Sequence, residues 1–207
     1  MAQYFHIHAR NPQARLIKQA TEILRVGGLI AYPTDSSYAL GCHLDDKQAV
    51  QRIRRIRKLD RHHNFTLVAS DLKQVSQFAK IDNEQYRLIK TLTPGPYTFI
   101  LNAKRLVPNR LVHPKRRTIG IRIPDNRIVQ SLLAEFAEPI MSASLILPND
   151  EFALGDPDEI RAILEHEVDL VIDGGTDTNQ TSTVIDWHND RLRILRHGAG
   201  DISFLED

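Results

Sequence analysis

The fold is decided by the stretch Tyr32-Pro33-Thr34-Asp35-Ser36-Ser37-Tyr38-Ala39-Leu40-Gly41. An apolar run from Leu29 ends at Pro33, whose missing N–H stops a strand or confines it to a sheet edge. Four small polar residues follow, and three of them carry a hydroxyl group. Open α/β sheets bind ligands at the ends of strands, so this turn predicts a binding site. An ordinary polar turn has the same composition, and the stretch alone leaves both interpretations open.

Helical and strand patterns alternate on both sides of this stretch. Helices are expected from Asn11-Pro12 to Gly27-Gly28 and over 46–59, 71–78, 83–92, 126–137 and 157–167. Strands are expected over 28–32, 65–69, 97–101, 118–123, 139–144, 168–173, 183–187 and 191–196. This alternation predicts an α/β fold, with an open mixed sheet and flanking helices in a single domain spanning residues 1–207.

Local signals predict where several elements begin or turn. Asn11 is the expected N-cap of the first helix and Asp45 that of the second, and Asp71 is expected to cap the third. The sequence Thr93-Pro94-Gly95-Pro96 places Pro and Gly where a type II turn favours them.

Composition bounds the class of protein. The chain has 207 residues, of which 42% are apolar and 26% charged, as is usual for a globular domain. No apolar run approaches the roughly 20 residues that span a bilayer. Cys42 is the only cysteine, so no internal disulfide can form. We therefore expect a cytoplasmic protein without a membrane segment.

The charge is divided unevenly along the chain. Residues 1–127 hold 23 Lys and Arg against 9 Asp and Glu, a net charge of +14, whereas residues 128–207 hold 4 against 17, a net charge of −13. The division indicates a polyanionic ligand for the first part. Alternatively, the two parts face each other and neutralise each other's charge.

The basic helix expected over 46–59 contains two kinds of arginine. Arg52 and Arg55 are typical of a solvated helix face. Arg57 lies beside Ile56 and one turn from Ile53, at the border of the buried face. There its guanidinium can turn into a cleft and bind phosphate with two hydrogen bonds.

Other candidate residues lie at strand ends. Arg122 interrupts an apolar strand, and it needs a partner there, either a protein carboxylate or a ligand anion. Ser142 and Ser144 are two residues apart and therefore share one face of a strand. Thr181-Ser182-Thr183 is a second hydroxyl cluster, and Arg196 closes the last expected strand.

Several kinds of site have no signal in the sequence. The histidines lack the spacing of a metal site built by the protein, and no P-loop or dinucleotide fingerprint is present. Cys42 has no evident base partner and is expected to be a small core residue.

Taken in order, a series of motifs resembles the YrdC/YciO family, on its YciO branch. The motifs are Tyr32-Pro33-Thr34-Asp35 with Tyr38 and Gly41, residues 57–67, Pro94-Gly95-Pro96-Tyr97-Thr98 with Ile100-Leu101, Gly120-Ile121-Arg122-Ile123-Pro124, Ser142-Ala143-Ser144, and residues 168–175, 182–186 and 195–198. The best-known members of this family are threonylcarbamoyl-AMP synthases. The resemblance implies a three-layer, twisted, open mixed sheet.

The resemblance also implies an activity and the residues that perform it. The reaction combines L-threonine, bicarbonate and ATP into threonylcarbamoyl-adenylate for tRNA modification and releases pyrophosphate, with Mg²⁺ arriving together with ATP. Arg57 and Thr34 would be the catalytic residues. Threonine would be held by Thr34, Asn64, Arg122, Ser142 and Ser182. The nucleotide would be held by Arg57, Lys58, Arg61, Thr118, Ser144 and Arg196.

Two positions depart from the synthase pattern. The family's Lys-x-Arg becomes Arg57-Lys58-Leu59, and its Ser-x-Asn becomes Ser142-Ala143-Ser144. Loss of one phosphate-facing charge would lower the rate by about 10²- to 10³-fold. The resemblance therefore leaves two alternatives to efficient synthesis. One is a module that binds double-stranded RNA or tRNA through Arg52, Arg54 and Arg55, and the other is carbamoyl transfer to a different acceptor.

Overall fold

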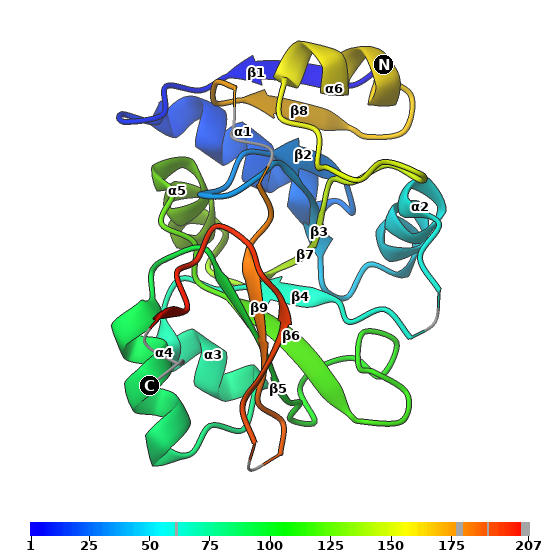
Figure 1. The fold of residues 1–207 in the computed structure, drawn as a ribbon. Helices are drawn as coiled ribbons and strands as arrows, with labels where there is room; N and C mark the ends of the chain where they lie inside the picture. The colour runs from blue at the N-terminus through cyan, green and yellow to red at the C-terminus, as the bar shows by residue number, and fades with distance from the viewer. Residues whose placement is uncertain (61, 177–179, 190, 204–207) are drawn as a thin grey trace.

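One ten-stranded sheet runs through the protein (Figure 1). The structure is a computed structural model, and it describes residues 1–60, 62–176, 180–189 and 191–203. The strands are β1 (Gln3–His6), β2 (Ile30–Tyr32), β3 (Ala39–His43), β4 (Thr66–Val68), β5 (Tyr97–Asn102), β6 (Thr118–Arg122), β7 (Ile140–Ser144), β8 (Leu170–Asp173), β9 (Thr183–Asp186) and β10 (Arg193–Arg196). Their order across the sheet is β1-β8-β2-β3-β7-β4-β6-β5-β9-β10.

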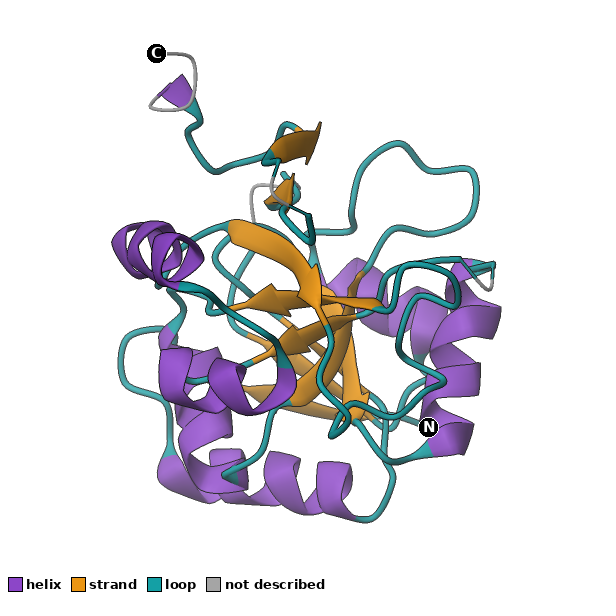
Figure 2. Ribbon diagram, turned by 90° about the horizontal axis from the view of Figure 1, so that it is seen from below, coloured by secondary structure: helices purple, strands orange, loops and turns teal. Residues whose placement is uncertain are grey.

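The helices lie on both sides of this sheet (Figure 2). They are α1 (Ala14–Arg25), α2 (Lys47–Arg57), α3 (Leu72–Phe78), α4 (Asn83–Leu92), α5 (Arg127–Phe136) and α6 (Pro157–Leu164). The sheet is mixed, because β8 pairs in parallel with β1 and β2 while β3 pairs antiparallel with β2 and β7. The predicted single-domain α/β fold with a mixed sheet and flanking helices is confirmed. None of the helices in the described ranges is long and apolar enough to cross a membrane.

Two apolar cores form on the two faces of the sheet because side chains alternate along each strand. Leu29 and Ala31 belong to the core that includes residues of α2, α3, α4 and α6, whereas Ile30 and Tyr32 belong to the core under α1 and α5. Burial of Ala49, Val50, Ile53 and Ile56 along α2 is as the helical spacing predicts. Cys42 is buried in the first core.

Some local predictions are wrong. The first helix begins at Ala14 and its N-cap is Gln13 rather than Asn11. Asp46, not Asp45, caps α2, and its carboxylate accepts a hydrogen bond from the Ala49 N–H at 2.7 Å. The type II turn is also wrong, because Gly95 is not among the described glycines with positive φ, and a type II turn requires positive φ there.

One further cap is predicted correctly, one helix is shorter than predicted, and two strands have no counterpart among the predictions. Asp71 caps α3, as predicted. α6 ends at Leu164, three residues before the predicted end. β1 and β3 were not predicted at all. β3 matters for the site, because it makes the residues after the Ser36-Ser37 turn into a central strand.

Candidate functional site

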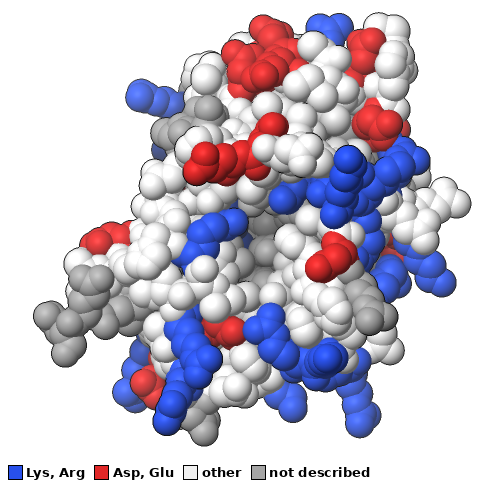
Figure 3. Space-filling model, turned by 45° about the vertical axis from the view of Figure 1, so that its right-hand side comes forward, with Lys and Arg blue, Asp and Glu red and all other residues white. Residues whose placement is uncertain are grey.

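The candidate site is a pocket on the part of the sheet that α1 and α5 leave uncovered. α1 and α5 pack over strands such as β8 and β2, and the same face continues onto β7, β4, β6 and β5. Its lining comprises Ala39, Arg57, His63, Asn64, Thr66, Val68, Thr98, Ile100, Gly120, Arg122, Ser142, Ala143, Ser144, Ile146, Ser182, Val184, Leu195 and Arg196. In the space-filling view the molecule is hollowed here, with Lys and Arg on several sides (Figure 3).

The floor of the pocket follows from strand register. Ser142 lies opposite Gly41 on one side and Thr66 on the other, and Thr66 lies opposite Gly120. Residues paired in this way point to the same face of the sheet. A Cβ at Gly120 would come within 2.6 Å of the Thr66 hydroxyl, so this row keeps its shape only with glycine there.

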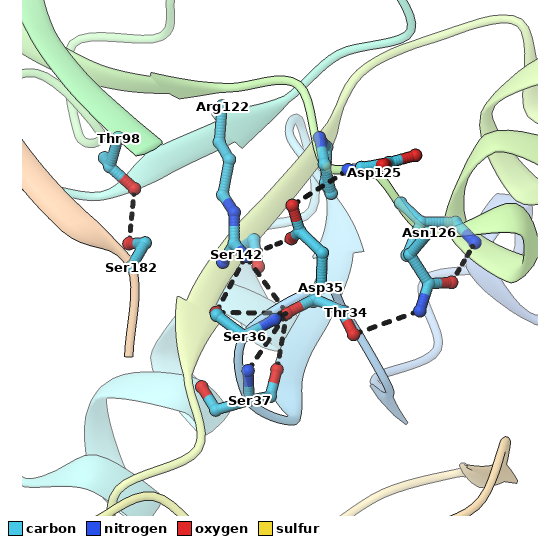
Figure 4. A network of polar contacts seen from close by, with 12 residues as sticks. Thr34, Asp35, Ser36, Ser37, Thr98, Arg122, Asp125, Asn126, Ser142 and Ser182 are labelled. Carbon is cyan, nitrogen blue, oxygen red and sulfur yellow. Dashed lines mark hydrogen bonds and ion pairs between the residues drawn. The ribbon is translucent and has the colours of Figure 1, made fainter. Parts of the chain in front are cut away.

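The Thr34 to Ser37 turn holds Arg122, a residue of the pocket lining (Figure 4). The Arg122 guanidinium donates to the Asp35 carboxylate, to the Ser36 hydroxyl at 2.7 Å and to the Thr34 hydroxyl at 3.1 Å. The other Asp35 oxygen accepts the Asp125 N–H at 2.9 Å. The partner that the sequence required for Arg122 is therefore a protein carboxylate, Asp35.

Thr34 organises this turn and lies behind Arg122. Its hydroxyl donates to the Ser37 carbonyl at 2.6 Å and accepts the N–H groups of Ser36 and Ser37. Its own carbonyl accepts a hydrogen bond from the Asn126 amide at 3.0 Å. Thr34 is buried and is absent from the pocket lining, so it reaches the pocket through Arg122.

Two further positive charges, Arg57 and Arg196, line the pocket. Arg57 donates to the Ser144 carbonyl, and its buried Nε has no hydrogen-bond partner among the described residues. Arg196 donates to the Ser182 carbonyl through Nε at 3.0 Å and a terminal nitrogen at 2.9 Å. In the described part of the chain, neither side chain forms an ion pair with a carboxylate. Burial, together with the charge of Arg196, lowers the pKa of Arg57 to about 10, and burial and Arg122 lower that of Arg196.

A β-bulge turns Arg196 into the pocket. Ile194 pairs with Ile185 and Arg196 with the next residue, Val184, so Leu195 is the extra residue on β10. By strict alternation Arg196 would point to the opposite face from Val184. The bulge restores it to the pocket face, as bulges beside functional sites do.

Hydroxyl groups line the middle of the pocket. Ser142 shares a 2.8 Å hydrogen bond with the Tyr32 hydroxyl, and Ser182 shares one of 2.8 Å with Thr98 (Figure 4). Burial raises the pKa of Tyr32 to about 12, so its phenol stays neutral and can still donate. The pocket thus offers hydroxyl groups together with a neutral Arg122–Asp35 pair and two guanidinium groups that form no ion pair with the described residues.

His63 is a pocket residue that no sequence signal indicated. Its ring meets Phe65 edge-on, with 5.6 Å between the centroids. Burial, with the charges of Arg57 and Arg54, lowers its pKa to about 4. The imidazole is therefore neutral at physiological pH and leaves the positive charge around it to the arginines. Thr98 is another lining residue that the sequence did not single out, and Tyr32, buried behind the lining, supports Ser142 through its hydroxyl.

The structure brings most of the predicted threonine and nucleotide residues together, and their roles remain predictions. Arg57, Asn64, Arg122, Ser142, Ser144, Ser182 and Arg196 line the pocket. Thr118 is fully buried behind it and donates to the Asn64 side-chain oxygen at 3.3 Å. Lys58 is exposed at the end of α2 and is absent from the lining, and Arg61 lies outside the described residues.

The arginines predicted to bind RNA have partners within the fold. Arg52 contacts Asp169 at 2.7 Å and Arg55 contacts Glu167 at 2.7 Å. Arg54 donates to the Asp60 carbonyl and stacks on Phe65, 4.6 Å from the ring centroid. RNA binding by these side chains stays a prediction, although part of their charge is already neutralised.

Comparison with known proteins gives the family. The family described as "Telomere recombination", the Sua5, YciO and YrdC group, matches residues 22–198. The chain belongs to this family. An uncharacterized protein of Haemophilus influenzae is 56% identical over 201 residues, covering 97% of each chain. The protein YciO of Escherichia coli is 52% identical over 202 residues, covering 98% of each, which agrees with the expected YciO branch.

Solved structures extend the likeness to the Sua5 side of the family. The crystal structure of E. coli YciO matches with a TM-score of 0.96 at 52% identity, covering 98% of each chain. The structure of P. abyssi Sua5 complexed with L-threonine matches with a TM-score of 0.87 at 25% identity, over 94% of this chain and 57% of that one. A threonylcarbamoyl-AMP synthase of Vibrio vulnificus is 30% identical over 131 residues, 62% of this chain and 70% of that protein.

Proposed function

We propose that this protein forms L-threonylcarbamoyl-adenylate from L-threonine, bicarbonate and ATP. The observation that carries the proposal is the pocket itself, which combines two arginines without a carboxylate partner among the described residues, several hydroxyl groups and the buried Arg122–Asp35 ion pair. Two relatives add support, since one is named a threonylcarbamoyl-AMP synthase and another binds L-threonine.

The reaction must bring two anions together. The amino group of threonine takes up the carbon of bicarbonate with loss of water, and an oxygen of the resulting carbamate attacks the α-phosphorus of ATP. The O–Pα bond forms as the bond to the β-phosphate oxygen breaks, and pyrophosphate leaves. Arg57 and Arg196 lower the repulsion by holding the phosphates, so catalysis is mostly positioning and electrostatic stabilisation.

We assign threonine to the part of the pocket beside Arg122. Arg122, held by Asp35 and Thr34, faces its carboxylate, and Ser142 and Ser182 provide hydrogen bonds in the middle. Lys58, Arg61, Thr118 and Ser144 complete the proposed nucleotide contacts, and Asn64 the threonine contacts. Mg²⁺ enters with the phosphates of ATP; among the described residues, no group of three or more His, Cys, Asp or Glu could hold a metal ion.

The test is an assay of pyrophosphate release by the purified full chain. Release is expected only when threonine, bicarbonate and ATP are all present, and Arg57→Met should lower kcat by about 10²-fold or more, because one transition-state charge is lost. Arg15→Met removes an equal charge from the exposed face of α1 and should leave kcat unchanged. Release that is independent of threonine in folded protein would overturn the proposal.

Binding of double-stranded RNA or tRNA is the second candidate. The loop between β5 and β6 favours it, since Lys104, Arg105, Lys115 and Arg117 are exposed there. A-form RNA would be recognised through phosphates and 2′-hydroxyls rather than sequence. Affinity should then fall steeply as salt rises, and a flat response to salt would contradict this candidate.

A further inference from the structure

A second hollow adjoins the pocket along β10. Leu195 lines both, and the remaining lining of the second hollow comprises Arg116, Asp186, His188, Asn189, Arg191 and Arg193. The proposed synthesis uses none of these six side chains. The hollow is rich in arginine, so its charge and its geometry indicate what it can bind.

Strand register places this hollow on the same face of the sheet as the pocket. Arg193 lies directly opposite Asp186, and Arg196 lies opposite Val184. Val184 and Asp186 are two residues apart on β9 and share a face. The bulge at Leu195 therefore brings Arg193 and Arg196 to one side of β10, about 10 Å apart along the strand.

Asp186 is a buried residue of the hollow that contacts two of its other side chains. Its carboxylate is only 7% exposed, and it contacts Arg116 at 3.1 Å and His188 Nδ1 at 2.5 Å. These contacts hold the Arg116 fork in place and fix the His188 ring, so that Nε2 is the ring nitrogen left for a ligand. A buried carboxylate that orients an imidazole is a feature of prepared binding sites rather than of a solvated surface.

The hollow keeps an excess of positive charge. Three arginines line it, and Asp186 is the one carboxylate in its lining. In the described ranges, the ion pairs within this lining both end on Asp186, and neither Arg191 nor Arg193 takes part in one. Two guanidinium groups therefore face the hollow without an anion among the described residues.

We propose that this hollow is a second anion subsite that binds a phosphate group through Arg116, Arg191 and Arg193, with His188 Nε2 beside them. Guanidinium forks match phosphate oxygens in geometry and stay charged at any physiological pH. Because the hollow adjoins the pocket, its ligand is a phosphate compound at the mouth of the pocket. That phosphate comes either from free pyrophosphate or from the phosphodiester backbone of a nucleic acid.

The test measures binding without turnover, so it is independent of the proposed synthesis. Inorganic pyrophosphate is titrated into the full chain by calorimetry at low ionic strength. Two binding sites are expected in the natural protein, one in the pocket and one in the hollow. Arg191→Ser/Arg193→Ser should weaken the second site about three- to thirty-fold, the effect of losing two exposed ionic contacts. Both side chains are exposed, so the fold should survive, and melting curves check this.

The matched control is Arg15→Ser/Lys18→Ser, which removes the same charge from the exposed side of α1. It should leave both sites unchanged. Equal binding by the Arg191/Arg193 variant and the natural protein, or an equal loss in the control, would overturn the proposal. A ten-nucleotide RNA without terminal phosphates distinguishes the sources. If the Arg191/Arg193 variant binds only pyrophosphate more weakly, the ligand is a free phosphate compound. If it also binds the RNA more weakly, the ligand is a phosphodiester backbone.

Discussion

Single residues decide how charge is distributed in the pocket. Arg122 and Asp35 cancel each other, while Arg57 and Arg196 do not meet a carboxylate in the described part of the chain. The sequence could predict that Arg122 needs a partner, because a charge on an apolar strand is costly. It could not show whether that partner is Asp35 or a ligand anion, because the answer depends on how the Thr34 to Ser37 turn folds back over β6. Leu59, where the resemblance to the synthases implies a second charge, packs against the core instead.

His63 gives a prediction about stability and pH. Its pKa in the folded protein is about 4, well below the ordinary value of 6.5, because of burial, Arg57 and Arg54. Between these values the unfolded chain binds more protons than the folded one, so stability falls as pH is lowered from 6.5 toward 4. In His63→Gln that fall should be smaller by on the order of 1 to 3 kcal/mol. Urea unfolding at pH 7 and pH 4.5 measures this.

An exposed histidine supplies the control for this prediction. His8→Gln changes an exposed histidine in the segment before α1, and it should leave the pH dependence of stability as it is. If His63→Gln and the natural protein lose stability in parallel as the pH falls, the imidazole of His63 is not held neutral by its surroundings.

At the scale of elements, the sequence predicts where helices lie better than it predicts where they end, and better than it predicts strands and strand register. The apolar spacing along α2 identifies its buried face, but Asp45 and Asp46 are both suitable caps, and only the phase of the helix selects Asp46. β3 was missed because its sequence follows a hydroxyl-rich turn and contains Gly41 and His43 among its five residues. The bulge at Leu195 could not be predicted either, since it depends on the register between β9 and β10. Strict alternation would have turned Arg196 out of the pocket.

The two neighbouring aspartates allow a matched test of the α2 cap. Asp46→Ala removes the hydrogen bond to the Ala49 N–H and should lower the free energy of unfolding by about 1 kcal/mol. Asp45→Ala loses only an exposed contact with Arg110 at 3.6 Å and should change stability by less than about 0.5 kcal/mol. Denaturant unfolding of the two variants measures the difference. Equal effects would mean that the cap does not anchor the helix that carries Arg57.

At the scale of the whole molecule, the basic residues 1–127 divide into those that pair with the acidic residues 128–207 and those that do not. Part of the basic residues 1–127 meets the acidic residues 128–207 directly, through the pairs Arg52–Asp169, Arg55–Glu167 and Arg116–Asp186. Other basic residues stay exposed, among them Lys104, Arg105, Lys115 and Arg117 between β5 and β6, and Arg57 and Arg122 line the pocket. Mutual neutralisation therefore describes part of the molecule, and a polyanionic ligand for the remaining cations stays a prediction. The sequence shows the division, but pairing between residues 70 to 117 positions apart follows only from the sheet order.

This arrangement predicts that two double variants, one on α2 and one in the loop between β5 and β6, have opposite effects on stability and on RNA affinity. Arg52→Gln/Arg55→Gln breaks two ion pairs, and it leaves Asp169 with only the Leu29 N–H, so the free energy of unfolding should fall by about 1 to 2 kcal/mol. Lys115→Gln/Arg117→Gln removes exposed charges that form no ion pair in the described residues, and stability should change by less than about 0.5 kcal/mol. Affinity for double-stranded RNA should show the reverse order, because counterion release depends on the cations that remain free. Unfolding curves and RNA titrations on both variants measure the two orders. If the α2 variant loses RNA affinity and keeps its stability, its arginines serve a polyanion rather than the acidic part of the chain.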